Sequence, residues 1–362
     1  MWLVPALRFP EFSREWKRHK LSEICSFYSG GTPSSSKKEF YNGNIPFIRS
    51  GELHKDKTEL FITEDGLNSS AAKLVEIGDL LLALYGATSG DIAISKIKGA
   101  INQAILCIRT KQNKKFIESV WNKHVERLLQ TYLQGGQGNL SADIVKNIPF
   151  YFADLEEQDK LANFISLLDE RISTQNKIIE KLETLIKGIV ETVISSQKPN
   201  TLIKNCLECN SSTLQESQVA ETGTFPVYGA TDISGYTETA GINGESILII
   251  KDGSGVGTVK FVSGEYSYIG TLNSLTAKDG YCLKYIYFAL QRFSFEPYKT
   301  GMAIPHIYFK DYGKAKIYCP SFSLQTLIAQ KLSLIENKME VEKRIILCYQ
   351  LQRSYLLSRM FI

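Results

Sequence analysis

A heptad repeat of apolar residues is the feature that most limits what this chain can fold into. One apolar set recurs every seven positions, and a second, mostly aliphatic set follows it by three. The two sets are Ile165, Ile172, Ile179, Ile186 and Val193, and Leu168, Gln175, Leu182 and Ile189. This a/d spacing is typical of a helix that buries a seam against another helix. No proline interrupts it before Pro199, so it predicts one helix from Glu156 to about Ser196, roughly 60 Å long.

A helix of this length needs a partner along its seam, and the chain supplies one near its other end. Apolar residues keep the same phase at Leu332, Ile335, Met339, Ile346, Tyr349, Leu356 and Met360. An ordinary core helix is the simpler alternative, but the pattern lasts over four heptads and then recurs. Because each helix follows a globular segment, we expect an antiparallel pair of long coiled-coil helices within one chain.

The globular segments read as one unit that occurs twice, at an offset of about 167 residues. Residues 243–248 match 77–82, residues 251–257 take the place of 85–90, and 322–325 stand where 155–158 stood. This duplication predicts an α+β fold with two similar globular α/β domains, separated by the helices and related by a pseudo-two-fold repeat. The predicted parts are a first domain, 1–154, a long helix, 155–198, a second domain, 199–320, and a C-terminal long helix, 321–362.

Alternating and continuous apolar runs give the elements of each domain. We expect a short amphipathic element over 16–26. Strands are predicted over 45–49, 80–84, 92–94, 104–108 and 148–152, and helices over 115–133 and 283–292.

Composition bounds the class of protein. No run of eighteen apolar residues occurs, and the first twelve residues hold prolines and charges where a signal peptide needs an apolar core. The seven cysteines have no regular spacing and look like free thiols of a reducing compartment. We therefore expect a soluble, cytoplasmic protein with no membrane partner. The net charge is +4, and residues 1–155 alone carry +4, which permits nucleic-acid contact without demonstrating it.

Sequence signatures of catalysis are missing. There is no phosphate-binding Gly-x4-Gly-Lys-Ser/Thr loop, no Asn-Pro-Pro-aromatic methyltransferase motif and no nuclease-type Pro-Asp with Glu-x-Lys. The glycines of 253–257 precede a strand-like segment, whereas a dinucleotide loop precedes a helix. Cys206 and Cys209 have no second pair, and none of the four histidines shows metal-ligand spacing. We predict no catalytic residues, no metal site and no cofactor bound by this chain.

Polar, glycine-rich loops recur at matching places in both halves, and single cations and aromatics lie among them. Glycine-exposed amides can hold phosphates, and Asn, Gln, Arg and Lys can read base edges. For any one loop the simpler interpretation is a solvated hairpin tip. Recurrence in both halves favours a binding role for the set.

The order of four motifs resembles the DNA specificity subunits of type I restriction–modification systems over essentially the whole chain. The motifs are the lead 4–12, the Ser29-Gly30-Gly31-Thr32-Pro33-Ser34 turn, Ile77-Gly78-Asp79, and Leu155-Glu156-Glu157-Gln158 at the start of a long helix. The resemblance implies two target-recognition domains at opposite ends of two antiparallel helices. Each domain would read one half of an asymmetric, split DNA site, and the helices would set the spacer between the halves.

The same resemblance implies the partners and the sites. They are double-stranded DNA, two methyltransferase subunits docked on the helices, and restriction/translocase subunits. S-adenosylmethionine, ATP and Mg²⁺ are expected on those partners. The implied DNA contacts are Ser29, Thr32, Arg49, Tyr85, Thr88, Ser89, Gln137 and Asn139 in the first domain, and Tyr228, Thr231, Lys251, Ser254, Lys299, Thr300 and His306 in the second.

The second copy departs from the pattern. Leu324 stands where the first copy has Glu157, and the Gly-Gly-Thr-Pro turn has no counterpart. The two domains should therefore read different sequences. A coiled-coil scaffold whose globular ends bind protein or glycan is the competing interpretation, because it too predicts a duplicated unit on a rod. A stand-alone enzyme is a third alternative.

Overall fold

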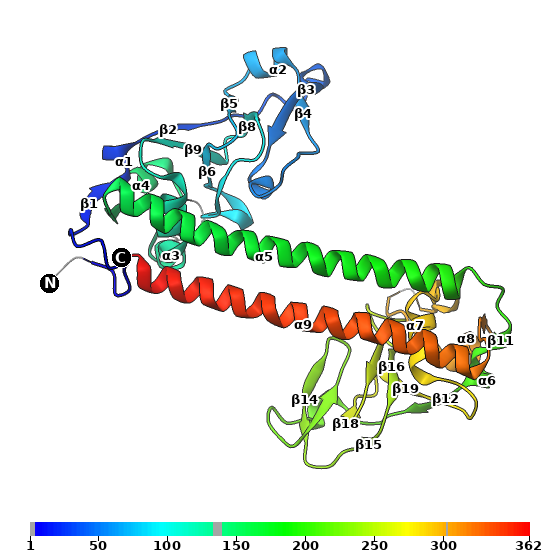
Figure 1. Ribbon diagram of the computed structural model, residues 1–362. Coiled ribbons are helices and arrows are strands. Elements are labelled where there is room, and N and C mark those ends of the chain that lie inside the picture. The colour runs from blue at the N-terminus through cyan, green and yellow to red at the C-terminus, as the bar shows by residue number, and fades with distance from the viewer. Residues whose placement is uncertain (1–3, 133–139, 302) are drawn as a thin grey trace. The chain divides into compact units, whose positions relative to one another are not determined.

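The computed structural model describes residues 4–132, 140–301 and 303–362 (Figure 1). Contacts within the chain divide it into two compact units. Unit 1 comprises residues 1–175 and 345–362, and unit 2 comprises residues 176–344. Both long helices, α5 and α9, therefore begin in one unit and end in the other. The four domain boundaries given above stay predictions.

Unit 1 contains two four-stranded sheets and one longer domain helix. The first sheet has the order β2 (Cys25–Ser29), β9 (Ile105–Thr110), β6 (Leu80–Ala83), β7 (Ile92–Ile94), with all neighbours antiparallel. The second has the order β4 (Phe61–Ile62), β3 (Tyr41–Ile48), β8 (Gly99–Ile101), β5 (Lys73–Val75), with β3 and β8 parallel. Helix α3 (Lys114–Tyr132) packs beside β7. The smaller elements are β1 (Lys17–Lys20), which pairs with β10 (Pro149–Phe152), α1 (Leu21–Ile24), α2 (Glu64–Asn68), α4 (Ala142–Asn147), and the 3-10 turns η1 (Lys38–Phe40), η2 (Ser50–Glu52) and η3 (Gly86–Thr88).

Unit 2 repeats this plan. Its first sheet is β12 (Leu207–Ser211), β19 (Leu272–Ala277), β16 (Ser246–Ile250), β17 (Val259–Val262). Its second is β14 (Ile233–Thr237), β13 (Phe225–Tyr228), β18 (Glu265–Tyr268), β15 (Ile242–Asn243), and β13 and β18 are again parallel. Helix α7 (Leu283–Gln291) takes the place of α3. The smaller elements are β11 (Thr201–Leu202), which pairs with β20 (Lys316–Ile317), α6 (Ile203–Cys206), α8 (Phe309–Tyr312), η5 (Glu216–Gln218) and η6 (Glu296–Tyr298).

The long helices are α5 (Leu155–Val190), which continues into a π-helical turn (Glu191–Ser195), and α9 (Phe322–Met360). In unit 1, Ile165 near the start of α5 shares a core with Met360 at the end of α9. In unit 2, Val190 at the end of α5 shares a core with Leu332 near the start of α9. The segments therefore run antiparallel within each unit. The predicted α+β fold with two similar domains and two antiparallel long helices is confirmed.

The predicted seam is wrong at its last position. Val193 is exposed, and Val190 and Ile194 are buried instead. A π-helical turn has more residues per turn than an α-helix, so the turn 191–195 shifts the phase of the seam. The predicted element over 16–26 is also different, because it comprises the strand β1, the single turn α1 and the start of β2.

A buried glutamine joins each domain to its long helix by equivalent hydrogen bonds. Gln158 accepts a hydrogen bond from the Asn113 amide at 3.1 Å and donates one to the Ala153 carbonyl at 2.7 Å. Gln325, 167 residues later, accepts one from the Cys282 amide at 3.0 Å and donates one to the Pro320 carbonyl at 2.8 Å. The duplication therefore extends to the contacts that hold the domains on the helices.

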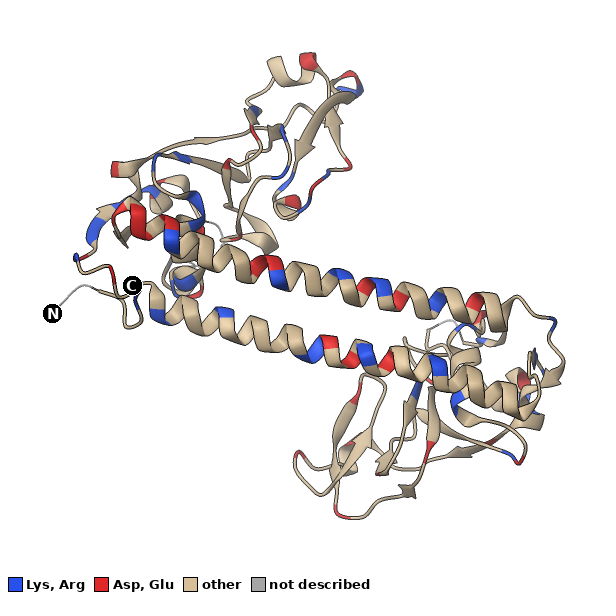
Figure 2. Ribbon diagram, viewed as in Figure 1, with Lys and Arg blue, Asp and Glu red and all other residues tan. Residues whose placement is uncertain are grey.

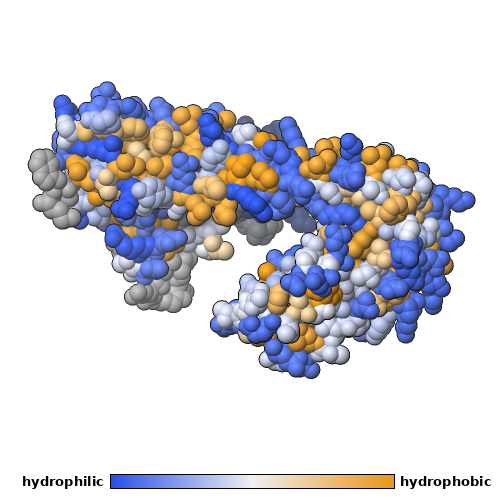
Figure 3. Space-filling model, turned by 60° about the horizontal axis from the view of Figure 1, so that its bottom comes forward, coloured by the Kyte–Doolittle hydropathy of each residue, from blue (hydrophilic) through white to orange (hydrophobic). Residues whose placement is uncertain are grey.

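The helix faces away from the seam are mixed. Charged residues of both signs follow one another along α5 (Figure 2), in agreement with a solvated face that includes Lys177, Lys181 and Lys187. Apolar residues also reach the surface (Figure 3), and those of α9 in unit 2 include Leu327, Leu334 and Val341. Within the described residues, no helix is both long and apolar enough to cross a membrane.

Candidate nucleic-acid interface

The loop after β6 in unit 1 and the loop after β16 in unit 2 have the same backbone frame. Four hydrogen bonds of one loop recur in the other at an offset of 167 residues, with lengths of 2.7–3.0 Å. From amide to carbonyl they are Ala83 to Asp91 and Ile250 to Thr258, Gly90 to Ala83 and Gly257 to Ile250, Leu84 to Ala104 and Lys251 to Thr271, and Leu140 to Leu84 and Ile307 to Lys251. The two loops are therefore structural counterparts.

Gly90 and Gly257 close these loops with left-handed backbones, at φ of +87° and +93°. A Cβ at Gly90 would lie 2.8 Å from a methyl carbon of Val125, and one at Gly257 would lie 3.0 Å from the Cβ of Phe295. Both the backbone angle and the tight contact therefore require glycine at these two positions.

In unit 2 this frame brings together four of the predicted site residues. Lys251 and Ser254 lie on the loop after β16, and Thr300 and His306 lie on a second loop that is bonded to it. The Gly253 amide donates to the Pro305 carbonyl at 3.0 Å. Lys299 directly precedes Thr300 in the sequence and forms an ion pair with Glu296. Together these residues form a polar surface built from two chain segments about fifty residues apart.

The other two predicted residues of unit 2, Tyr228 and Thr231, lie at the turn between β13 and β14. There Lys260 of β17 reaches across, with its Nζ 4.7 Å from the centre of the Tyr228 ring, and forms an ion pair with Asp232. Lys260 comes two residues after Thr258, so the turn adjoins the loop frame. Sequence reasoning missed Lys260 and Asp232, and nothing local to either residue indicated the contact.

The lysines of this surface are already paired. Lys251 Nζ lies 3.0 Å from a carboxylate oxygen of Asp252, and Lys260 and Lys299 pair with Asp232 and Glu296. The local charge is therefore close to balanced, which agrees with the near-neutral second half of the sequence.

In unit 1, Tyr85, Thr88 and Ser89 lie together on the loop after β6, and Tyr85 is exposed. The Ser89 hydroxyl donates to the Leu84 carbonyl at 3.0 Å, so it supports the loop frame. The Trp121 indole donates to the Gly90 carbonyl at 2.8 Å and fixes the loop against α3.

The glycine turn that follows β2 uses its backbone donors internally. The Gly30 and Gly31 amides donate to the carbonyls of Ile105 and Ile101, so these N–H groups are not free for phosphate. Ser29 is paired within the sheet, opposite Leu106. Thr32 is exposed and hydrogen-bonds to the side chain of Gln103. Gln103 was not predicted, although a polar Asn-Gln pair between two apolar strands could have indicated it.

Arg49 lies beyond β3 and is half exposed. Its Nη2 lies 3.2 Å from Glu52 and 3.8 Å from Glu59. The hydrogen bond to Glu52 raises the pKa of Arg49. The Arg49 guanidinium therefore spends part of its N–H donors on these two carboxylates, and only the remaining donors face solvent.

Gln137 and Asn139, the remaining predicted residues, lie outside the described residues. None of the other predicted residues is buried. Their part in binding stays a prediction.

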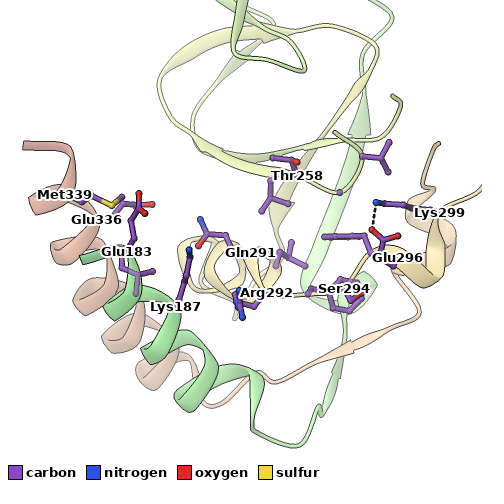
Figure 4. A pocket seen from close by; sticks show the side chains of 17 residues that line it. Glu183, Lys187, Thr258, Gln291, Arg292, Ser294, Glu296, Lys299, Glu336 and Met339 are labelled. Atoms are coloured by element: carbon purple, nitrogen blue, oxygen red, sulfur yellow. Dashed lines mark hydrogen bonds and ion pairs between the residues drawn. The ribbon is translucent and has the colours of Figure 1, made fainter. Parts of the chain in front are cut away.

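A cavity of about 730 Å³ adjoins the loop surface in unit 2 (Figure 4). Lys187 of α5 and Glu336 of α9 line one side, Arg292 lies beyond the end of α7, and the Lys299–Glu296 pair lies on the other side. A cavity of about 850 Å³ in unit 1 is likewise lined by α5, α9 and the end of the loop after β6. Cations and carboxylates are mixed in both, so neither gives a clear net attraction for an anion. Within the described ranges, no group of three His, Cys, Asp or Glu side chains could hold a metal ion.

A family model described as the type I restriction modification DNA specificity domain matches this chain over residues 13–184 and again over 205–347. The two matches cover most of the chain and correspond to the two copies of the duplicated unit.

Individual relatives agree with this match. The type I restriction enzyme EcoR124I/EcoR124II specificity subunit of Escherichia coli is 28% identical over 187 residues, which cover 49% of this chain and 45% of the relative. The chain thus spans about half the length of that curated relative. The EcoprrI specificity subunit of Escherichia coli is 21% identical over 88% of this chain and 86% of the relative.

Among solved structures, the S subunit of a type I restriction-modification system from M. genitalium aligns over 99% of both chains, with a TM-score of 0.70. The sequence identity is 18%, so this likeness establishes the fold alone.

Proposed function

This chain belongs to the type I restriction modification DNA specificity family, and from that premise we propose that it is the specificity subunit of a type I restriction–modification complex. In this role it binds double-stranded DNA in the cytoplasm and directs partner subunits to their target. The observation that carries the proposal is the duplicated loop frame, because it offers two equivalent binding surfaces on one chain.

Each unit would read one half of a split site. The backbone frames of the two units match, whereas the side chains that they present differ, with the exposed Tyr85 in one place and Asp252 in the other. Base discrimination depends on the side chains that reach the groove, so two frames with different side chains would read two different half-sites. The result is an asymmetric target.

The paired lysines of unit 2 limit the non-specific DNA affinity that we expect from this unit. Non-specific DNA affinity comes mainly from cations that neutralise phosphates. Lys251, Lys260 and Lys299 are paired with carboxylates, so unit 2 would add little of this general attraction. We infer that partner subunits supply much of the phosphate contact and that the loops of this chain supply selectivity.

The helices would dock two methyltransferase subunits. Leu327, Leu334 and Val341 are exposed at seven-residue spacing on α9, as expected for a surface that receives a partner helix. A groove of about 460 Å³ beside Leu334 is lined in part by the small residues Ala329 and Ser333, which allow close approach. Restriction/translocase subunits would join the same complex.

Catalysis is assigned to the partners. A methyltransferase subunit would flip an adenine out of the duplex and methylate it from S-adenosylmethionine. ATP and Mg²⁺ would serve the translocating subunits. The chain itself would bind DNA and position these enzymes.

Genome-wide mapping of adenine methylation, with and without this gene, tests the proposal. Deletion should abolish methylation at one split, asymmetric motif and leave other motifs unchanged. A scaffold that binds protein or glycan predicts no change while the methyltransferase genes remain expressed. That outcome would overturn the proposed function.

A further inference from the structure

An exposed apolar side chain lies on the second loop of the unit 2 surface. Ile304 is 65% exposed, and among the described large hydrophobic residues only Ile77 is more exposed. An aliphatic side chain of this size gains free energy when it leaves water, so a partner that covered Ile304 would be bound more tightly.

The backbone on both sides of Ile304 is firmly held. Thr300 and His306 exchange two backbone hydrogen bonds, of 2.9 and 2.8 Å, which close the loop at its base. The amides of Gly253 and Ile307 tie it to the loop after β16, at 3.0 and 2.9 Å. This bracing presents Ile304 to solvent on a fixed support, which suits a recognition element.

The side chains that follow Ile304 in the sequence suit nucleic acid. Tyr308 is 47% exposed, the His306 ring lies 5.5 Å from its ring, and Lys310 Nζ lies 5.1 Å from its centre. Cations contact phosphates and can also read base edges, whereas aliphatic groups contact bases through the thymine methyl. Of these groups, the aliphatic Ile304 can interact with a base only through apolar contact.

The two copies of the duplicated sequence differ at this register. Ile307 and Leu140 make the same hydrogen bond, to Lys251 and Leu84, so they define a common register. Three residues upstream in sequence, unit 2 has Ile304 and the first copy has Gln137. A glutamine amide reads adenine by hydrogen bonds, whereas an aliphatic group reads the thymine methyl. A change of side-chain chemistry at one register of a duplicated sequence is expected at a position that selects bases.

We propose that Ile304 is a specificity-determining residue of unit 2, which makes an apolar contact to one base of the half-site that this unit reads. The inference rests on the proposed function, and it names one residue through which unit 2 would select its half-site.

The test is base preference in the complete complex. The chain is co-expressed with its methyltransferase subunits, and each base pair of both half-sites is randomised in a plasmid library. The methylated fraction of every library member is then read by long-read sequencing. Ile304→Ala should lower discrimination at one base pair of one half-site by roughly five- to tenfold and leave the other half-site unchanged. Ile304→Gln should change the preferred base at that same position.

Ile77→Ala serves as the matched control, because Ile77 is 69% exposed, close to the value for Ile304, but belongs to unit 1. It should leave the half-site affected by Ile304→Ala unaltered. Unchanged base preferences in Ile304→Ala, or an equal loss of methylation on all library members, would overturn the inference while the proposed function stands. Absence of any methylated motif with the wild-type chain would overturn both.

Discussion

At the scale of single residues, two buried glutamines carry the junctions between domains and helices. Gln158 is fully buried, and its replacement by alanine leaves the Asn113 amide and the Ala153 carbonyl without their partner. An unsatisfied buried group costs about 1–3 kcal/mol, so Gln158→Ala should lower the free energy of unfolding of unit 1 by about 2–4 kcal/mol. Thermal unfolding followed by circular dichroism measures the effect. Glu156→Ala, at an exposed neighbouring position, should change little, and equal melting of both variants would contradict the assigned role.

Asp79 of the Ile-Gly-Asp turn should make stability depend on pH. Burial alone would raise its pKa, but hydrogen bonds from the Glu76 amide, Arg109 and Lys114 lower it below the usual value. A depressed folded-state pKa gives stability that is present above the unfolded pKa and is lost as pH falls through the folded pKa. Asp79→Asn should therefore destabilise unit 1 at pH 7, and its difference from wild type should shrink below about pH 4.

Urea unfolding at pH 7 and at pH 3.5 checks this expectation. Asp56→Asn, at an exposed position, is the control and should follow the wild type at both values. A difference for Asp79→Asn that stays constant across the range would show that its carboxylate charge is not responsible.

At the scale of elements, substitutions on the exposed face of α9 should affect partner binding without affecting the stability of the chain. Leu334 is 64% exposed and lines the groove beside α7. Leu334→Asp should leave the melting temperature nearly unchanged, because it removes no core contact. It should weaken co-purification of the methyltransferase subunit by at least about tenfold, because it places a charge in an apolar interface. Leu332 lies two residues earlier on the buried face of α9. Leu332→Ala should lower the free energy of unfolding by about 2–5 kcal/mol and leave co-purification of the methyltransferase subunit nearly unchanged.

The same scale shows how far sequence alone reaches. The long helices could be predicted because heptad spacing is local and repeats many times. The two copies could be aligned because the motifs around Gln158 and Gln325 recur at one offset. The π-helical turn could not be predicted, because a single shift in phase gives no repeated pattern. It moved burial from Val193 to Ile194.

The candidate site was less accessible to sequence reasoning. The loops that carry Lys251 and His306 could be predicted as polar turns, but their pairing depends on how distant segments meet. Lys260 lies over Tyr228 because two different sheets approach each other, which no local pattern encodes. The sequence shows that Gly30 and Gly31 have backbone N–H groups in a turn. Only the structure shows that these N–H groups donate to the carbonyls of Ile105 and Ile101.

At the scale of the whole molecule, the length of the helices should set the spacer of the DNA target. Seven residues add about 10.5 Å to a helix, which corresponds to roughly three base pairs at 3.4 Å each. A heptad keeps the a/d seam in phase, so insertion of seven residues into both α5 and α9, near 175 and 344, should preserve their pairing.

The expected product is a methylated motif with the same two half-sites and a spacer about three base pairs longer, read by genome-wide mapping of adenine methylation. Insertion into α5 alone is the matched control. It displaces the seam of one helix against an unchanged partner, so it should abolish methylation. If the doubly extended chain kept the original spacer, the length of the helices would not determine the distance between the half-sites. That distance would then have to be set by the partner subunits.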